Sequence, residues 1–249
     1  MSGHSKWANI KHKKEKTDAQ KGKIFTKLGR EIAIAVKQGG SDPAGNSRLS
    51  DIIAKAKAAN VPNDNIMRSI KKAAGDTDQA SYEEIAYEGY GSGGVAVIVE
   101  TLTDNRNRTA GDIRHFFDKY GGNLGTTGCV SFMFNKKGLI LIEKDEEKAP
   151  GQEEQEEKVM SDAIEAGAED FSSGDGYYEV ITEPADFSEI RKKLEEKGYA
   201  FADASLAMIP TTWVRTESDE QTDLMEKLIE HLEDLDDVQN VWHNWETDE

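Results

Sequence analysis

The hydrophobic pattern of the chain changes near residue 80, and this change limits the folds that the chain can adopt. Before it, apolar residues recur at helical spacing, and Gly39-Gly40 and Pro62 interrupt the pattern. After it, short apolar runs typical of buried strands alternate with amphipathic helical segments. The sequence therefore predicts a small helical domain followed by a larger α+β region.

The first region predicts three helices, each with one apolar face. They are expected at Lys23–Lys37, at Ser47–Ala59 and from Asn63 onward. The short breaks between them favour a compact bundle over residues 23–75. Residues 1–22 precede it as a basic arm that is expected to be extended or only partly ordered, and Gly75–Ala80 is typical of a linker.

The α+β region predicts two units, one inserted in the other. The inserted unit, residues 136–206, has expected strands and helices at Leu139–Ile142, Gln155–Ala166, Tyr177–Ile181 and Asp186–Lys197, followed by extended chain through Ile209. Asp186 and Glu189 are expected to form a capping pair at the second helix. This order is typical of the ferredoxin-like β-α-β-β-α-β arrangement.

The outer unit, residues 82–135 plus 207–249, shows the same order. Its expected elements are a strand at 95–101, a helix at 109–120, strands at 129–134 and 207–215, a helix at 221–235 and a strand at 238–245. The predicted fold class is thus multidomain α and α+β, with an N-terminal three-helix domain followed by two ferredoxin-like α+β domains, one inserted in the other.

Charge is divided as sharply as hydrophobicity. Residues 1–75 hold 16 Lys+Arg and 6 Asp+Glu, a net charge of +10. The remaining residues hold 31 − 16 = 15 basic and 48 − 6 = 42 acidic side chains, a net charge of −27. This asymmetry indicates a basic domain that binds polyanions, and the alternative is that one part of the molecule only neutralises the other.

The basic arm and the first helix carry the candidate nucleic-acid-binding residues. Clustered ammonium and guanidinium groups bind phosphates, and a tryptophan among them offers a face on which a base can stack. The alternative is a solubilising tail whose tryptophan docks on the helical domain. The candidates are Lys6, Trp7, Lys11, Lys13, Lys14, Lys16, Lys21, Lys23, Lys27 and Arg30.

Arg106 and Arg108 form a candidate secondary phosphate contact, because they lie beside an expected helix start. Equally, Asp104 and Asn105 build the turn while the two arginines pair with the acidic domain. The sequence leaves these two interpretations open.

No arrangement for catalysis is apparent. Cys129 and His115 could form a nucleophile–base pair, but nothing orients them, and Cys129 opens an apolar strand where a core thiol is expected. The five histidines lack metal-ligand spacing. The run Gly89–Gly94 matches GxGxxG but precedes a strand, so it is typical of a turn. We therefore expect no catalytic residue, metal, cofactor or small-molecule substrate.

The same sequence indicates a cytoplasmic protein. Its single cysteine allows no internal disulfide, which fits a reducing compartment. The N-terminus MSGHSKWANIKHKK lacks the apolar core of a secretory signal. No apolar run is long enough to span a bilayer, so no membrane partner is expected.

Several long segments resemble the YebC family, and the resemblance covers the whole chain. They are GHSKWANIKHKK, GKIFTKLGREI, GGSDPAGNSRL, KAANVPNDNI, YEGYGSGGVAVIVETLTDNRNRT and GGNLGTTGCVSFMF. The resemblance implies a helical domain followed by two α+β domains. Ser92 is a small departure, since the family's YGPGG turn has proline at that position.

The family resemblance implies a regulator of gene expression. Members are described as probable transcriptional regulators that bind DNA. Mitochondrial relatives are described as translational activators of a cytochrome oxidase subunit, and bacterial relatives have been linked to relief of ribosome stalling at consecutive prolines.

We therefore expect a non-enzymatic regulator that binds nucleic acid through its basic N-terminal domain. A DNA-binding transcriptional regulator is the first hypothesis. An RNA- or ribosome-binding translation factor is the second, because an extended lysine arm with one tryptophan suits an irregular RNA surface. An acidic protein-interaction scaffold is the third.

Overall fold

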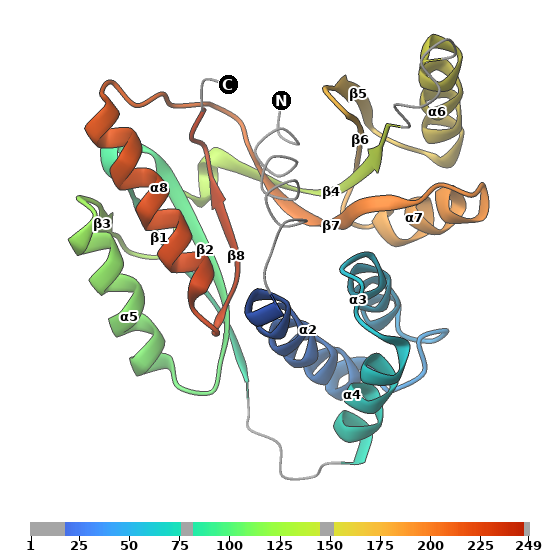
Figure 1. The fold of residues 1–249 in the computed structure, drawn as a ribbon, viewed down its shortest axis with the longest axis horizontal. Coiled ribbons are helices and arrows are strands. Elements are labelled where there is room, and N and C mark those ends of the chain that lie inside the picture. Colours follow the sequence, from blue (N-terminus) through green and yellow to red (C-terminus); the bar gives the residue numbers. More distant parts are fainter. Residues whose placement is uncertain (1–17, 76–81, 145–151, 247–249) are drawn as a thin grey trace.

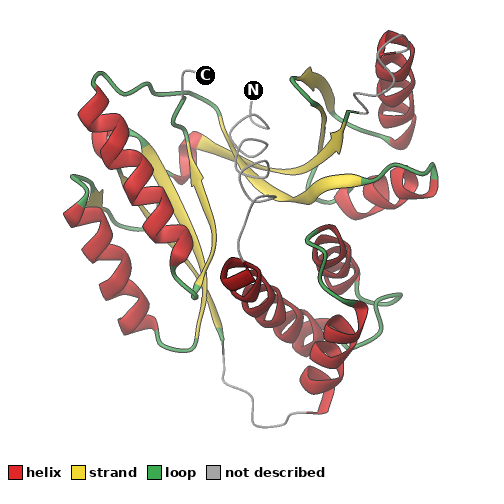
Figure 2. Cartoon of the chain, in the orientation of Figure 1, coloured by secondary structure: helices red, strands yellow, loops and turns green. Residues whose placement is uncertain are grey.

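The structure is a computed structural model that describes residues 18–75, 82–144 and 152–246. Figures 1 and 2 show a helical domain that lies against two α+β domains, each with two long helices on one face of its sheet. This arrangement confirms the predicted fold class at the level of an α domain followed by two four-stranded α+β domains.

The helical domain contains α2 (Asp18–Gly39), α3 (Ser47–Ala58) and α4 (Asn63–Gly75). Its core is built from one apolar face of each helix, with Leu28, Ile32, Leu49, Ile52, Ile66 and Ile70 buried. Asn46 holds the turn between α2 and α3, because its side chain accepts a hydrogen bond from the Leu49 amide and donates to the carbonyls of Ala35 and Gly40. The three predicted helices are therefore confirmed.

The start of α2 differs from the prediction. Residues 18–22 were expected to belong to an extended arm, whereas α2 begins at Asp18. Ala19, Gln20 and Lys21 are good helix formers, so the helix extends N-terminally beyond its first buried residues.

The second α+β domain has the ferredoxin-like topology. It contains β4 (Phe134–Glu143), α6 (Gln152–Ala166), β5 (Asp170–Gly174), β6 (Tyr177–Thr182), α7 (Phe187–Glu196) and β7 (Phe201–Pro210). Its strand order is β5-β6-β4-β7. The expected Asp186 capping pair is wrong, because Asp186 has helical dihedrals and its side chain makes no cap hydrogen bond.

The first α+β domain reaches a similar sheet by a different route. It contains β1 (Glu83–Tyr90), β2 (Ala96–Thr103), α5 (Arg106–Lys119), β3 (Asn123–Leu124), α8 (Asp219–Asp234) and β8 (Val238–His243). The strand order is β3-β1-β2-β8, and β1, which was not among the predicted elements, lies between β3 and β2.

Two predicted strands of this domain are wrong. Residues 129–133 instead form a loop and the short 3-10 turn η2 (Ser131–Met133), because the amides of Val130 and Ser131 bond to the Glu88 carboxylate rather than to a neighbouring strand, and Phe134 begins β4. Of the strand expected at 207–215, residues 207–210 belong to β7 in the sheet of the second α+β domain. That strand ends at Pro210, which has no amide hydrogen to continue a ladder, and beyond it Val214 forms an isolated parallel bridge with Trp245.

Strands β4 and β7 join the two α+β domains. They pair antiparallel from Phe134 opposite Pro210 to Ile142 opposite Phe201, and Figure 1 shows them crossing from one domain to the other. The predicted divisions at 135/136 and 206/207 fall inside these two strands. The connection is therefore a hydrogen-bonded ribbon.

The glycine run before β2 forms a tight connection between β1 and β2. Gly93 and Gly94 have φ of 71° and 77°, which side chains rarely adopt, and the 3-10 turn η1 (Ser92–Gly94) lies between the two strands. The sequence indicated a turn here, and in the structure this turn connects the two strands of a hairpin.

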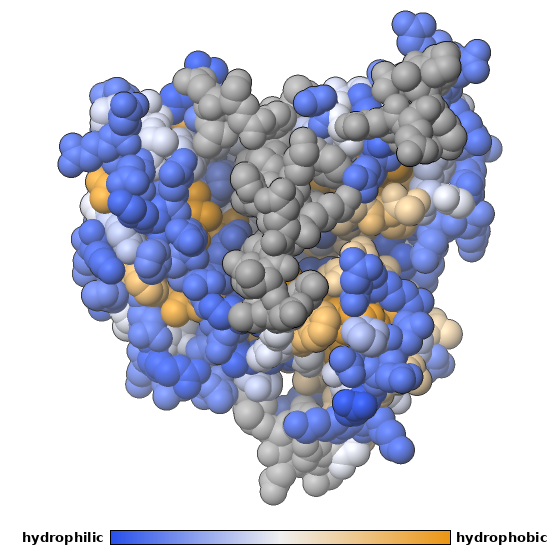
Figure 3. All heavy atoms as spheres, in the orientation of Figure 1, coloured by the Kyte–Doolittle hydropathy of each residue, from blue (hydrophilic) through white to orange (hydrophobic). Residues whose placement is uncertain are grey.

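The surface in the orientation of Figure 3 is mainly hydrophilic, with small apolar patches around the junction of the domains. Among the residues that the structure describes, no helix combines the length and the apolar character needed to cross a bilayer.

Candidate nucleic-acid interface

Most of the predicted basic cluster lies outside the part of the chain that the structure describes. This applies to Lys6, Trp7, Lys11, Lys13, Lys14 and Lys16, and the side chain of Lys21 is likewise outside the description. Their role remains a prediction. The side chains of Lys23, Lys27 and Arg30 are described and lie on α2.

These three side chains face the C-terminal end of α8. Lys23 Nζ lies 3.0 Å from Asp234 Oδ1, and Lys27 Nζ donates to the Glu233 carbonyl at 2.6 Å. Arg30 Nη1 donates to the Asp236 carbonyl at 2.6 Å and to Asp237 Oδ1 at 2.8 Å. The end of a helix carries partial negative charge, so α2 uses these cations to bind the acidic part of its own chain. We call this contact the α2–α8 seam.

Asp237 is the anchor of the α2–α8 seam. Besides Arg30, its carboxylate accepts hydrogen bonds from Arg108 at 2.7 Å, Thr109 at 2.8 Å and Thr103 at 3.2 Å. Burial alone would raise its pKa, but the hydrogen bonds from Arg108 and Thr109 and the charges of Arg108 and Arg30 hold the pKa below its usual value. Asp237 is therefore ionised and fully coordinated by its own chain at neutral pH.

The two arginines of the candidate secondary phosphate contact, Arg106 and Arg108, lie in different surroundings. Arg108 Nη2 pairs with Asp104 at 2.9 Å and with Asp237, which favours the intramolecular interpretation for this side chain. Asn105 caps α5 by accepting from the Arg108 amide at 3.1 Å. Arg106 is exposed at the first residue of α5, and the described residues provide no ion pair for its side chain.

Helix α4 presents a second group of cations that the predicted site did not include. Arg68, Lys71 and Lys72 are exposed, and their spacing places them on one face of the helix. Within the described ranges, none of the three forms an ion pair. We call these three residues the α4 basic face.

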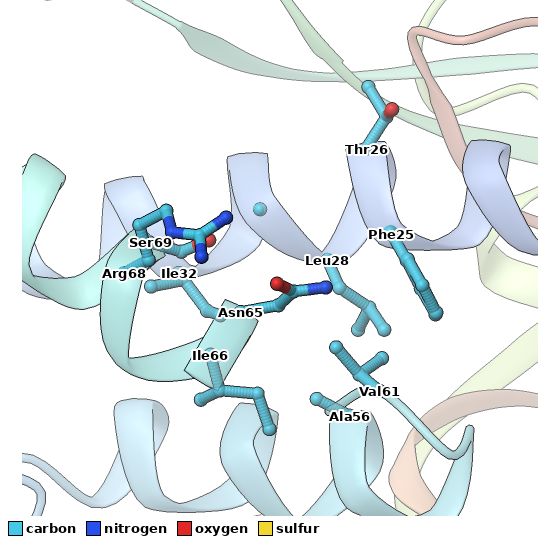
Figure 4. A pocket seen from close by; sticks show the side chains of 11 residues that line it. Phe25, Thr26, Leu28, Ile32, Ala56, Val61, Asn65, Ile66, Arg68 and Ser69 are labelled. Carbon is cyan, nitrogen blue, oxygen red and sulfur yellow. The ribbon is translucent and has the colours of Figure 1, made fainter. Parts of the chain in front are cut away.

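A pocket of about 300 Å³ lies between α2 and α4 beside this face. Figure 4 shows Arg68, Ser69 and Asn65 near one end of it and Phe25 near the other, with Leu28 and Val61 between. Because most of its lining belongs to the core of the helical domain, the pocket is a small recess under the α4 basic face.

The helical domain contacts the second α+β domain through a separate interface. Arg191 of α7, whose side chain is 2% exposed, lies with Nε 3.0 Å from Asp51 Oδ1 and Nη1 2.8 Å from Glu195 Oε2. Ser188 also donates to Asp51. We call this contact the α3–α7 seam, and its charges are reversed, because here the helical domain supplies the acid.

A larger cavity of about 650 Å³ lies where the three domains meet. Two of its cations are paired within the lining, with Lys55 Nζ 2.8 Å from Glu31 and Arg48 bonded to Glu84, and its carboxylates outnumber its cations. Burial alone would lower the pKa of Lys55, but the charge and hydrogen bond of Glu31 raise it above its usual value. The cavity therefore offers little net positive charge to a polyanion.

The structure separates the two residues considered for catalysis. His115 lies on α5 with its ring edge-on to Phe116, whereas Cys129 lies in the loop that Glu88 holds. Burial and the nearby Glu88 charge raise the pKa of the Cys129 thiol, which disfavours the nucleophilic thiolate. No group of His, Cys, Asp and Glu suited to a metal occurs among the described residues.

Two family models match the chain along nearly its full length. The model described as "TACO1/YebC protein N-terminal domain" matches residues 5–76, and the model described as "TACO1/YebC second and third domain" matches residues 82–245.

Curated relatives and a solved structure agree with these matches. A "Probable transcriptional regulatory protein" from Acetivibrio thermocellus is 65% identical, covering 98% of this chain and 99% of its own. One of the same name from Ruminiclostridium cellulolyticum is 64% identical, covering 100% and 98%. The crystal structure of a conserved hypothetical protein from Aquifex aeolicus is similar with a TM-score of 0.82 at 44% identity, covering 94% of this chain and 93% of its own.

Proposed function

The chain belongs to the TACO1/YebC family, and from this premise we propose that it is a cytoplasmic, nucleic-acid-binding regulator of gene expression that acts without catalysis. The observation that carries the proposal is the segregation of charge, +10 over residues 1–75 against −27 beyond them. The contact surface comprises the predicted arm residues together with the α4 basic face, Arg68, Lys71 and Lys72, whose cations are exposed.

The first form of the proposal is a DNA-binding transcriptional regulator. The relatives named "Probable transcriptional regulatory protein" support it. Such a protein holds a defined duplex more tightly than random duplex, by roughly 10³-fold or more at physiological salt.

A second form, an RNA- or ribosome-binding translation factor, is favoured by the placement of the helices. Helices α2 and α3 are both engaged with the α+β domains, so α4 is the helix of this domain that presents a free basic face. That face carries Arg and Lys but no row of Asn or Gln for reading base edges in a major groove. The acidic domains would also repel a long duplex lying across them.

A charge-reversal experiment tests what both forms have in common, which is nucleic-acid binding by the basic arm. Replacing Lys11, Lys13, Lys14 and Lys16 with Glu should weaken binding to any nucleic acid by orders of magnitude and flatten its salt dependence. The matched control replaces four lysines of the acidic domains, Lys119, Lys158, Lys192 and Lys227, with the same change in net charge. Equal losses in both variants, measured by gel-shift titration, would contradict a specific role for the arm.

Sedimentation separates the two forms. A translation factor co-migrates with ribosomes through a sucrose gradient of cell lysate, and nuclease treatment of polysomes moves it to the monosome fractions. A transcriptional regulator remains at the top of the gradient and selects defined promoter duplexes in competition with random DNA. The second outcome would eliminate the translation form.

A further inference from the structure

The most exposed large apolar side chain among the described residues is Phe132, at 74%. It lies in η2 between two buried anchors, Val130 at 0% and Phe134 at 5% exposure. Both anchors pack with Ala96 and Ile98 in one core cluster. The chain therefore fixes the residues on either side of Phe132 and leaves this aromatic ring in solvent.

The loop that carries Phe132 is held by a buried carboxylate. Glu88 of β1 accepts backbone hydrogen bonds from Gly128 at 2.8 Å, Val130 at 2.9 Å and Ser131 at 2.8 Å. Burial alone would raise the pKa of Glu88, but these three hydrogen bonds hold it below the usual value. The position of Phe132 is thus set before any partner arrives, which reduces the entropy lost on binding.

Further bonds tie the loop to its surroundings. Tyr90 donates its hydroxyl hydrogen to the Cys129 carbonyl at 3.2 Å. The amide and hydroxyl of Thr211, from the segment after β7, donate to the Met133 carbonyl at 2.8 Å and 3.0 Å. The loop therefore rests on the ribbon that joins the two α+β domains.

This part of the molecule is free of the acidity that marks the rest of residues 76–249. Residues 119–142 contain no Asp or Glu and form the longest such stretch of the chain, and residues 204–216 also contain none. The carboxylate that holds the loop, Glu88, is ionised but buried, and three backbone amides of the loop bond to it. A polyanion can therefore approach here although the domains carry a net charge of −27 overall.

The polar groups around Phe132 suit a sugar–phosphate backbone. Gly125, Thr126, Thr127 and Gly128 are all exposed, and so are Thr211 and Thr212. The amides of Gly125 and Gly128 and both donors of Thr211 are bonded within the chain, so the groups offered to a partner are the hydroxyls of Thr126, Thr127 and Thr212. Hydroxyls of this kind bond phosphate and sugar oxygens. A protein partner would need a contiguous apolar patch, whereas the ring of Phe132, far more exposed than that of nearby Tyr90 and bordered by hydroxyls, matches the size of one base.

We propose that Phe132 is a stacking platform for an unpaired nucleobase of RNA, with the exposed Gly125–Gly128 segment beside the adjoining backbone. The occupant is RNA because its loops and ends present unstacked bases, while the bases of duplex DNA are already stacked and paired. The inference rests on the proposed function and adds a contact on the α+β side, remote in sequence from the basic arm.

The test compares Phe132→Ala, Phe132→Leu and Phe132→Trp in the full chain. The probe is an unstructured uridine-rich RNA of about 12 nucleotides, within the range of single-strand sites, with a duplex of the same length as second probe, both followed by fluorescence anisotropy. Phe132→Ala should weaken binding of the single strand by roughly 5- to 100-fold, since stacking on one aromatic side chain is worth about 1–3 kcal/mol. Phe132→Trp should retain binding, and Phe132→Leu should not.

The controls separate failure of this inference from failure of the proposed function. Ile164→Ala removes another exposed apolar side chain, on α6, and should leave the affinity for both probes unchanged. Duplex binding should be the same for Phe132→Ala and the wild type, whereas the four-lysine arm variant should lose both probes. Unchanged single-strand binding in Phe132→Ala, or full binding in Phe132→Leu, would overturn the stacking proposal while leaving the arm result intact.

Discussion

The two seams of the helical domain use the same kinds of residue in opposite ways. In the α2–α8 seam, the helical domain supplies the cations Lys23, Lys27 and Arg30, and the first α+β domain supplies carbonyls and carboxylates. In the α3–α7 seam, the helical domain supplies the carboxylate of Asp51, and the second α+β domain supplies the guanidinium group of Arg191.

The seams also differ in their access to water. Arg191 is 2% exposed, whereas the Lys23–Asp234 pair at the edge of the other seam is 42% and 65% exposed. Salt and phosphate compete well with exposed ion pairs and poorly with buried ones. If the chain binds a polyanion as proposed, we expect it to displace the exposed edge of the α2–α8 seam, while the α3–α7 seam keeps the helical domain attached.

The largest effect is expected from breaking the buried seam. Arg191→Ala should lower the free energy of unfolding by about 3–5 kcal/mol, because it leaves the Asp51 carboxylate without its buried partner. Urea denaturation monitored by tryptophan fluorescence measures this loss. Lys192→Ala, at the exposed neighbouring position, is the control and should stay within about 0.5 kcal/mol of the wild type. If Arg191→Ala lowered the free energy of unfolding by less than about 1 kcal/mol, the buried pair would contribute no more to stability than an exposed one, and the contrast between the two seams would not hold.

Asp237→Asn should have the next largest effect, a loss of about 1–3 kcal/mol, because the amide turns a donor toward groups that are themselves donors. Because the folded-state pKa of Asp237 is lowered, its contribution is present above the ordinary value of 3.8 and is lost as the pH falls through the folded pKa.

The difference in stability between wild type and Asp237→Asn should therefore shrink below about pH 3.8 and be constant near neutrality. Asp236→Asn is the matched control, since only the backbone carbonyl of that residue contacts Arg30. A difference that persists unchanged in acid would show that the Asp237 charge is not what holds the seam.

The helices were the most predictable part of this fold. Their apolar periodicity matches the buried faces of α2, α3 and α4, because a helix makes its backbone hydrogen bonds within its own segment and packs one regularly spaced face against its neighbours. The strand β1 escaped prediction since Glu83, Glu84 and Glu88 interrupt any alternating pattern. Glu88 faces inward because it binds the amides of a loop some 40 residues later, and a local pattern carries no trace of that contact.

The candidate site was only partly predictable for the same reason. Clustered lysines and arginines are visible in the sequence, and their use within the chain is not. Arg30 and Arg108 both bind Asp237, a residue that lies far along the chain from either of them. The exposed ring of Phe132 was hidden within an apolar run that resembles a strand, and only the η2 turn places it outside.

The smallest change in stability is expected at Lys23, and comparing Lys23 with Arg30 of the same seam is the sharpest test of the comparison. Lys23→Gln removes an exposed pair and should alter the free energy of unfolding by less than about 0.5 kcal/mol. If Lys23 exchanges Asp234 for a phosphate during binding, the same variant should reduce the slope of log K against log salt by about one. Arg30→Gln should behave in the opposite way, because Arg30 is largely buried and bonded to Asp237 and to the Asp236 carbonyl.

Arg30→Gln should thus destabilise the fold by about 1–2 kcal/mol while leaving the salt slope of binding unchanged. Urea denaturation and salt titration of RNA binding measure the two quantities on the same preparations. Equal reductions of the slope in both variants would mean that Arg30 also reaches phosphate, and hence that the whole α2–α8 seam opens on binding rather than its exposed edge alone. The α3–α7 seam would then be the buried charged contact that keeps the helical domain in place, beside the exposed Arg48–Glu84 pair, and Arg191→Ala should weaken that attachment in the bound state.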